Sequence, residues 1–132
     1  MPVRVLVIVS GSEAIAAYAA AGKQFTDEYG EAFELVFATD LPSGLERWEE
    51  NGPFESVVAY DNIEGHSTVD FIRFVNQLHK TGFGGKLVVV TGSTDADYLS
   101  ELIEIGCDDI CTTGDKPYTV IDSTLLVMTQ PA

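Results

Sequence analysis

The 132-residue chain has few basic residues, few cysteines and no long apolar run. Seven Lys and Arg stand against 21 Asp and Glu, which gives a formal net charge of −14 at pH 7. Contacts to phosphate groups require Lys and Arg, so this balance excludes unassisted binding to nucleic acids or to anionic membranes. The acidic balance agrees with a well-solvated surface, with a basic protein partner or with a multivalent cation.

The two cysteines, Cys107 and Cys111, have no histidine near them in the sequence. A structural zinc site requires more ligands than these two thiols, so no zinc site is indicated. We expect both thiols to be reduced and the protein to be cytoplasmic. The sequence also has no run of about 18 apolar residues and no basic leader followed by an apolar segment, so it predicts neither a membrane span nor secretion.

Apolar β-rich segments alternate with helical segments along the whole chain. The predicted strands are 3–9, 33–38, 56–60, 87–90 and 110–112, and the predicted helices are 13–25, 43–50, 68–79, 95–105 and 120–128. Short, continuous apolar runs are typical of strands that are buried on both faces of a parallel sheet. The alternation therefore predicts a single α/β domain over residues 1–132, a doubly wound five-stranded parallel sheet with helices on both faces.

Ligands of such sheets bind at the carboxyl ends of the strands, so the residues there are the candidates for function. The turn Ser10-Gly11-Ser12 precedes a predicted helix. Backbone N–H groups at a helix start favour an anion, but the preferred interpretation of Ser12 is a structural helix cap. No dinucleotide fingerprint and no Walker pattern occurs in the sequence, so a nucleotide site is not indicated.

Four groups of residues resemble, in their order and spacing, the response-regulator receiver family. They are Val57-Val58-Ala59-Tyr60-Asp61, Val90-Thr91-Gly92, Gly106-Cys107-Asp108-Asp109 and Lys116-Pro117. The resemblance covers nearly the full length and implies a flavodoxin-like (βα)5 three-layer sandwich with strand order 2-1-3-4-5. It also implies a module of phosphorelay-type signal transduction that contacts protein partners or a second copy of itself.

The family transfers a phosphoryl group to an aspartate at the end of strand three. Two acids on strand one help that aspartate to hold Mg²⁺, and a lysine and a hydroxyl contact the phosphoryl oxygens. The resemblance implies that Asp61 is the acceptor, or Tyr60 when the chain is aligned without a gap. It further implies that Thr91 and Lys116 contact the phosphate.

Two departures from the family pattern bear on this chemistry. The acid pair of strand one falls on Val9 and Ser10, and neither residue supplies a carboxylate. An insertion, residues 113–115, precedes Lys116, and we expect it to displace the lysine from the site, with Thr113 in its place. The sequence thus predicts a non-enzymatic pseudo-receiver without a cofactor or a metal.

Two other functions stay open from the sequence. One is a divergent phosphoacceptor that uses Mg²⁺ together with Asp61, Thr91 and Lys116. The more distant one is a flavodoxin-like protein that binds an anion or a small molecule at Ser10-Gly11-Ser12.

The resemblance also implies an interaction surface. In receivers, the fourth helix, the fifth strand and the fifth helix usually form the partner or dimer face. Tyr98 falls on the fourth predicted helix and Tyr118 follows Pro117. These tyrosines either contribute to such a face or are partly buried against the sheet.

Overall fold

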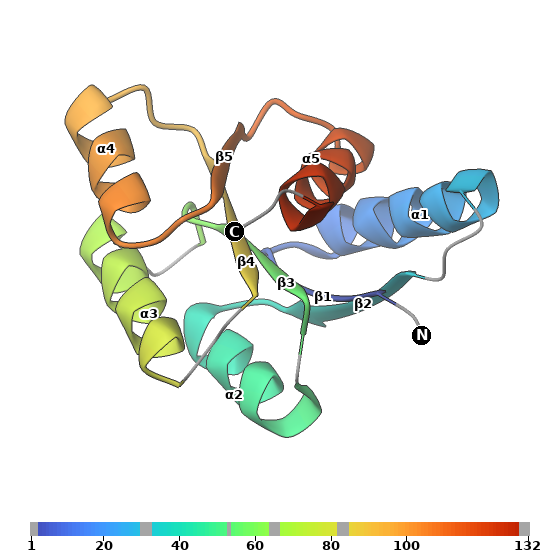
Figure 1. Ribbon diagram of the computed structural model, residues 1–132, viewed down its shortest axis with the longest axis horizontal. Helices are drawn as coiled ribbons and strands as arrows, with labels where there is room; N and C mark the ends of the chain where they lie inside the picture. The colour runs from blue at the N-terminus through green and yellow to red at the C-terminus, as the bar shows by residue number, and fades with distance from the viewer. Residues whose placement is uncertain (1–2, 30–32, 53, 64–66, 82–84, 130–132) are drawn as a thin grey trace.

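The computed structural model describes residues 3–29, 33–52, 54–63, 67–81 and 85–129. Strands and helices alternate strictly along the chain (Figure 1). The strands are β1 (Val3–Ile8), β2 (Phe33–Ala38), β3 (Ser56–Tyr60), β4 (Lys86–Thr91) and β5 (Asp109–Thr112). The helices are α1 (Ser12–Tyr29), α2 (Leu41–Asn51), α3 (Thr68–Lys80), α4 (Ala96–Glu104) and α5 (Pro117–Thr129). Within these ranges, no helix combines the length and the apolar character of a membrane span.

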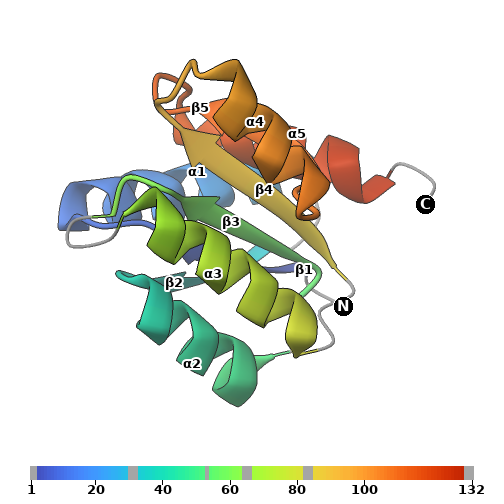
Figure 2. The same ribbon diagram turned by 90° about the vertical axis from the view of Figure 1, so that its left-hand side faces the viewer.

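The strands form one parallel sheet in the order β2-β1-β3-β4-β5, which confirms the predicted fold class and strand order. Helices α1 and α5 cover one face of the sheet, and α2, α3 and α4 cover the other (Figures 1 and 2). The strand order reverses between β1 and β3, so a crevice for ligands is expected at the carboxyl ends of the central strands.

The core consists of two clusters, one on each face of the sheet. Side chains of β3 alternate between them, because Val57 and Ala59 pack toward α2, α3 and α4 while Val58 packs toward α1 and α5. The central strands are therefore buried from both sides, which is why their sequences are continuously apolar.

Side chains cap the starts of two helices. The carboxylate of Asp40 accepts the Ser43 N–H at 2.8 Å and caps α2, which begins two residues earlier than predicted. The earlier start is possible because Pro42 is tolerated in the first helical turn. Ser67 caps α3 in a reciprocal pair with Asp70.

Three other helix boundaries differ from the prediction. Helix α1 continues to Tyr29, and α5 already begins at Pro117, where a proline needs no hydrogen-bond partner. Ser12 is not the cap of α1 but its first residue, and the Gly11 carbonyl accepts the Ile15 N–H at 3.2 Å. Gly11 adopts a φ of 103°, a left-handed conformation that glycine reaches without a steric penalty.

The turn after α4 has a structural role that explains its sequence. Gly106 has a φ of 107°, its N–H donates to Ile103, and the Cys107 N–H donates to Leu102, which is a Schellman ending. This left-handed φ strains any other residue, and a Cβ atom at Gly106 would also lie 2.6 Å from His79 Nε2, so the His79 ring would have to shift. Asp108 then accepts the Leu87 N–H at 2.8 Å and joins the turn to the start of β4.

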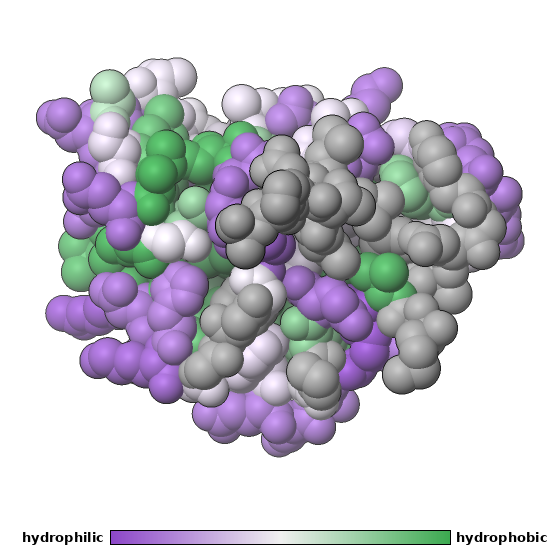
Figure 3. Space-filling model, in the orientation of Figure 1, coloured by the Kyte–Doolittle hydropathy of each residue, from purple (hydrophilic) through white to green (hydrophobic). Residues whose placement is uncertain are grey.

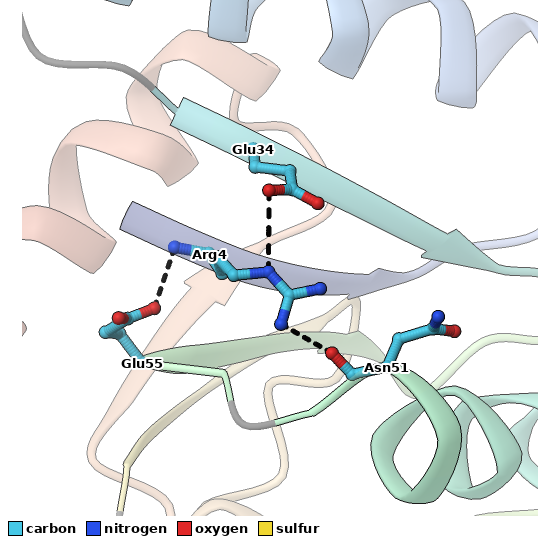
Figure 4. A network of polar contacts seen from close by, with 4 residues as sticks. All are labelled: Arg4, Glu34, Asn51 and Glu55. Carbon is cyan, nitrogen blue, oxygen red and sulfur yellow. Dashed lines mark hydrogen bonds and ion pairs between the residues drawn. The ribbon is translucent and has the colours of Figure 1, made fainter. Parts of the chain in front are cut away.

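At the amino end of the sheet, Arg4 connects several elements (Figure 4). Its guanidinium donates to the Asn51 carbonyl, lies 3.5 Å from the Glu34 carboxylate and sits 4.8 Å above the centre of the Phe54 ring. The backbone N–H of Arg4 also donates to Glu55 at 2.7 Å. This residue therefore holds β1, β2 and the connection from α2 to β3 together.

Candidate functional site

The carboxyl ends of β3 and β4 bring Asp61 and Thr91 to the same level of the sheet. The last registered pair of these strands is Tyr60 with Val90, and Asp61 and Thr91 are the next residue on each side. The Asp61 N–H donates to the Val90 carbonyl at 3.2 Å, so strand-like pairing continues to this point. Their side chains consequently leave the sheet on the same face.

Two neutral hydroxyl groups donate to a single oxygen of Asp61. The Thr91 hydroxyl lies 2.6 Å and the Tyr98 hydroxyl 2.7 Å from Oδ2. Thr91 is only 2% exposed, whereas Asp61 and Tyr98 are half-buried. Burial and the bond to Asp61 raise the pKa of Tyr98, so its hydroxyl keeps its proton and stays a donor. Among the described residues, Asp61 forms no ion pair.

A closed series of hydrogen bonds joins this carboxylate to α4. Besides donating to Asp61, the Thr91 hydroxyl accepts the Ser93 N–H at 3.1 Å. The Ser93 hydroxyl accepts the Asp95 N–H at 3.1 Å, and Asp95 caps α4. Tyr98 in the first turn of α4 then returns to Asp61. The loop from β4 to α4 is thus linked to the Asp61 carboxylate at both of its ends, through Thr91 and through Tyr98.

Tyr60, the alternative acceptor, faces the other side of the sheet. Its hydroxyl lies 2.6 Å from the hydroxyl of Tyr18 on α1, and the two rings meet edge-on at 6.1 Å. Burial raises the pKa of both phenols. The structure therefore brings Asp61, and not Tyr60, together with Thr91.

Lys116 forms no ion pair with the Asp61 carboxylate. The inserted residues form a turn in which the Thr112 N–H donates to the Asp115 carboxylate at 3.0 Å and the Asp115 N–H donates back to the Thr112 carbonyl at 3.0 Å. Lys116 follows this turn with an exposed side chain, which makes no hydrogen bond or ion pair to any residue that the structure describes. Thr113 instead donates its N–H to the Thr91 carbonyl at 3.2 Å and lies beside Gly92.

The residues around Asp61 do not fit a magnesium ion. The register of β1 with β3 ends at Ile8 and Ala59, and two residues further along are Ser10 and Asp61. Val9 is buried and Ser10 is exposed, so β1 offers no carboxylate at this end. In the part of the chain that the structure describes, no group of three or more His, Cys, Asp or Glu could hold a metal ion. Mg²⁺ prefers carboxylate oxygens in octahedral geometry, and this donor set is too small.

The two tyrosines of the predicted interaction face lie on opposite faces of the sheet. Tyr118 packs against Phe25 at 5.2 Å and donates to Glu28 at 2.6 Å, on the side of α1 and α5. Tyr98 packs on the side of α2, α3 and α4. The sequence interpretation missed its bond to Asp61. The available signal was its place in the first turn of the helix that follows Thr91.

The fold is shared with solved receiver domains, although neither a known family model nor a curated protein matches the sequence. A CheY-like receiver domain protein from Methanospirillum hungatei is similar with a TM-score of 0.79 and 15% identity, over 97% of this chain and 94% of that chain. The chemotaxis response regulator CheY4 of Vibrio cholerae gives a TM-score of 0.78 at 14% identity, over 96% and 99%. The NarL receiver domain of Mycobacterium tuberculosis gives 0.79 at 11%, over 98% of both chains. At these identities the likeness establishes the fold alone.

Proposed function

We propose that this chain is a receiver-like signalling module that works through protein–protein contact and transfers no phosphoryl group. The observation that carries the proposal is the environment of Asp61, whose carboxylate accepts bonds from the neutral hydroxyls of Thr91 and Tyr98. A phosphoryl group beside a carboxylate requires positive charge from a metal ion or a lysine. Here Ser10, two residues after the end of β1, lies level with Asp61. Lys116 follows the inserted turn and is exposed. The module is accordingly not an enzyme and needs no cofactor.

The partners in this proposal are signalling proteins or a second copy of the chain. The net charge of −14 disfavours nucleic acids and anionic membranes. Both cysteines are free and buried, and burial raises the pKa of Cys107 to about 12, so its thiol stays protonated and unreactive. Free thiols of this kind support a cytoplasmic location.

Incubation with acetyl phosphate and Mg²⁺, followed by intact-mass measurement, tests this function. We expect no stable gain of mass in the wild-type chain, because none of the described residues places a cation against Asp61 to stabilise an acyl phosphate. A gain of one phosphate that disappears in Asp61→Asn would contradict the proposal. A gain that persists in Asp61→Asn and disappears in Tyr60→Phe would identify Tyr60 as the acceptor.

One observation favours a second candidate, a divergent phosphoacceptor. The 2.6 Å contact pairs Asp61 with Thr91, the hydroxyl that would contact a phosphorylated aspartate. This candidate predicts a modification that requires Mg²⁺ and that becomes slower in Lys116→Ala. The same mass measurement therefore separates the two functions.

A further inference from the structure

The two edge strands of the sheet differ in how their outward backbone groups are used. On β5, the Ile110 N–H donates to the Asp109 carboxylate at 2.9 Å. The Thr112 N–H donates to the Asp115 carboxylate at 3.0 Å. Both groups point away from β4, because the Thr113 N–H donates to β4 and alternate residues of a strand face opposite sides. Aspartate side chains therefore take up the N–H groups that a further strand would need at this edge.

On β2, the corresponding N–H groups have no acceptor among the described residues. The Val9 N–H donates to the Ala38 carbonyl at 3.0 Å, so the backbone of Ala38 faces β1. By alternation, the backbone groups of Leu35 and Phe37 face away from β1. The register with β1 runs through β2 without a bulge, and β2 contains no proline. A regular, apolar edge of this kind is a template for pairing with another strand.

A groove of about 350 Å³ lies between α1 and β2 beside this edge. Gly22 of α1 lies over the strand, since a Cβ atom there would be 3.0 Å from Leu35 Cδ1. Figure 3 shows small hydrophobic areas between hydrophilic ones, one of them in the region of α1 and β2. Small and apolar residues and one lysine line the groove: Ala19, Gly22, Lys23, Thr26, Leu35 and Phe37.

We propose that the edge of β2 and this groove form the contact with a second copy of the chain. A two-fold axis at the middle of β2 pairs the two strands antiparallel and joins the two sheets into one. The same axis sets α1 of the two copies side by side on one face, where Ala19 and Gly22 allow a close approach. The inference rests on the proposed function, which requires protein–protein contact, and names the surface and the partner.

The charges on α1 favour a second copy as the occupant. Lys23 and Asp27 are exposed, lie one helical turn apart and form no ion pair with a described residue. In two antiparallel copies of α1, Lys23 of one copy faces Asp27 of the other, so a single surface supplies both signs. Such exposed pairs contribute little affinity and mainly fix the orientation. They do so against the repulsion between two chains of net charge −14.

Sedimentation equilibrium from about 1 µM to about 1 mM protein, at about 0.15 M salt, tests the proposal. We expect a reversible equilibrium between monomer and dimer in the wild type. Ala19→Arg should raise the dissociation constant by roughly tenfold, because the new side chain fills the groove. Ala20→Arg is the matched control, since it makes the same charge change at an exposed alanine of α1 outside the groove. It should stay within about twofold of the wild type.

Leu35→Pro tests the pairing of the strands. Proline removes an N–H group that points away from β1, so the bonds between β1 and β2 are retained. We expect a folded monomer, with the fold checked by circular dichroism. A Leu35→Pro chain that dimerises with the wild-type affinity would contradict pairing through β2.

Lys23→Asp and Asp27→Lys identify the second copy as the occupant. Each variant alone should dimerise about fivefold more weakly, because each places like charges opposite one another. The two changes move the net charge in opposite directions, so a general charge effect would strengthen association in Asp27→Lys. An equal mixture of the two variants should recover the wild-type affinity, and a mixture as weak as the single variants rules out the two-fold arrangement.

Two further results would overturn the proposal. One is a wild-type chain that stays monomeric up to about 1 mM, which would leave the edge of β2 to a strand of another protein. The other is a dimer that neither Ala19→Arg nor Leu35→Pro weakens. Phosphoryl transfer is measured separately: a phosphorylated chain would contradict the proposed function and leave the dimer standing, whereas a monomeric chain would contradict this inference alone.

Discussion

The two ends of the sheet surround a charged side chain in different ways. At the amino end, the Arg4 guanidinium contacts the Glu34 carboxylate and the Asn51 carbonyl (Figure 4). It also lies over the Phe54 ring. At the carboxyl end, the described residues give Asp61 two hydrogen bonds, both from hydroxyls, and one of these hydroxyls belongs to α4. Within the described part of the chain, Arg4 is thus paired with an opposite charge and Asp61 is not.

This difference separates a structural site from a site that can respond. The contacts of Arg4 join β1 to β2 and to the end of α2, so they stabilise the arrangement of these elements. Neutral donors around an anion are weaker than a cation would be and can be replaced by a ligand that carries positive charge. The carboxyl end is therefore the end at which a chemical change can alter the structure.

The largest expected effect is at the amino end. Arg4→Met should lower the free energy of unfolding by about 2–3 kcal/mol, since it removes the bond to Asn51, the ion pair with Glu34 and the contact with Phe54. Urea denaturation measures this value. Arg47→Met, at an exposed arginine of α2, is the matched control and should stay within about 0.5 kcal/mol of the wild type. Equal losses of stability in Arg4→Met and Arg47→Met would show that the contacts of Arg4 do not stabilise the amino end of the sheet.

An intermediate effect is expected at Thr91. Thr91→Val keeps the shape but loses the donor to Asp61 and the acceptor for Ser93, which should cost about 1–2 kcal/mol. Thr91→Ser retains the hydroxyl and should cost less. If serine were as destabilising as valine, the methyl group rather than the hydroxyl would hold the carboxyl end together. The measurement is again urea denaturation, in which the dependence of the unfolding free energy on urea concentration is compared among the variants.

The smallest effect distinguishes the ends by their response to alkaline pH. The pKa of Tyr98 is raised in the folded chain, so its contribution to stability is present below the ordinary tyrosine pKa of about 10 and is lost as the pH rises above it. The stability difference between wild type and Tyr98→Phe should consequently shrink above pH 10. Arginine does not titrate in this range, so the difference between wild type and Arg4→Met should stay constant. Parallel pH profiles for the two pairs would contradict this distinction.

Most of the fold could be predicted from the sequence because its apolar runs have the lengths of strands buried on both faces. Capping side chains such as those of Asp40 and Ser67 accept a backbone N–H within a few residues, so helix starts also depend on local sequence. The boundaries that failed are those set by packing. Helix α1 passes its predicted end at Phe25 because Phe25 itself packs beneath Tyr118 of α5.

The site was predictable only in part. Successive strand residues point to opposite faces, so the choice between Tyr60 and Asp61 depends on the pairing with β4, which the sequence does not contain. The register of Tyr60 with Val90 places Asp61 beside Thr91. The contact of Tyr98 with Asp61 spans 37 residues and depends on how α4 lies over the strand ends, which local patterns do not determine. At Asn51, Arg4 donates to a backbone carbonyl. Every residue has such a carbonyl, so the sequence does not indicate this contact.

The packing around Phe54 also gives the protein an optical property. Its single tryptophan, Trp48, lies 6.0 Å from the Phe54 ring, and the Arg4 guanidinium lies over the same ring. The fluorescence of Trp48 will therefore report on the amino end of the sheet. The single tryptophan thus allows the stability of this end to be followed without attaching a dye.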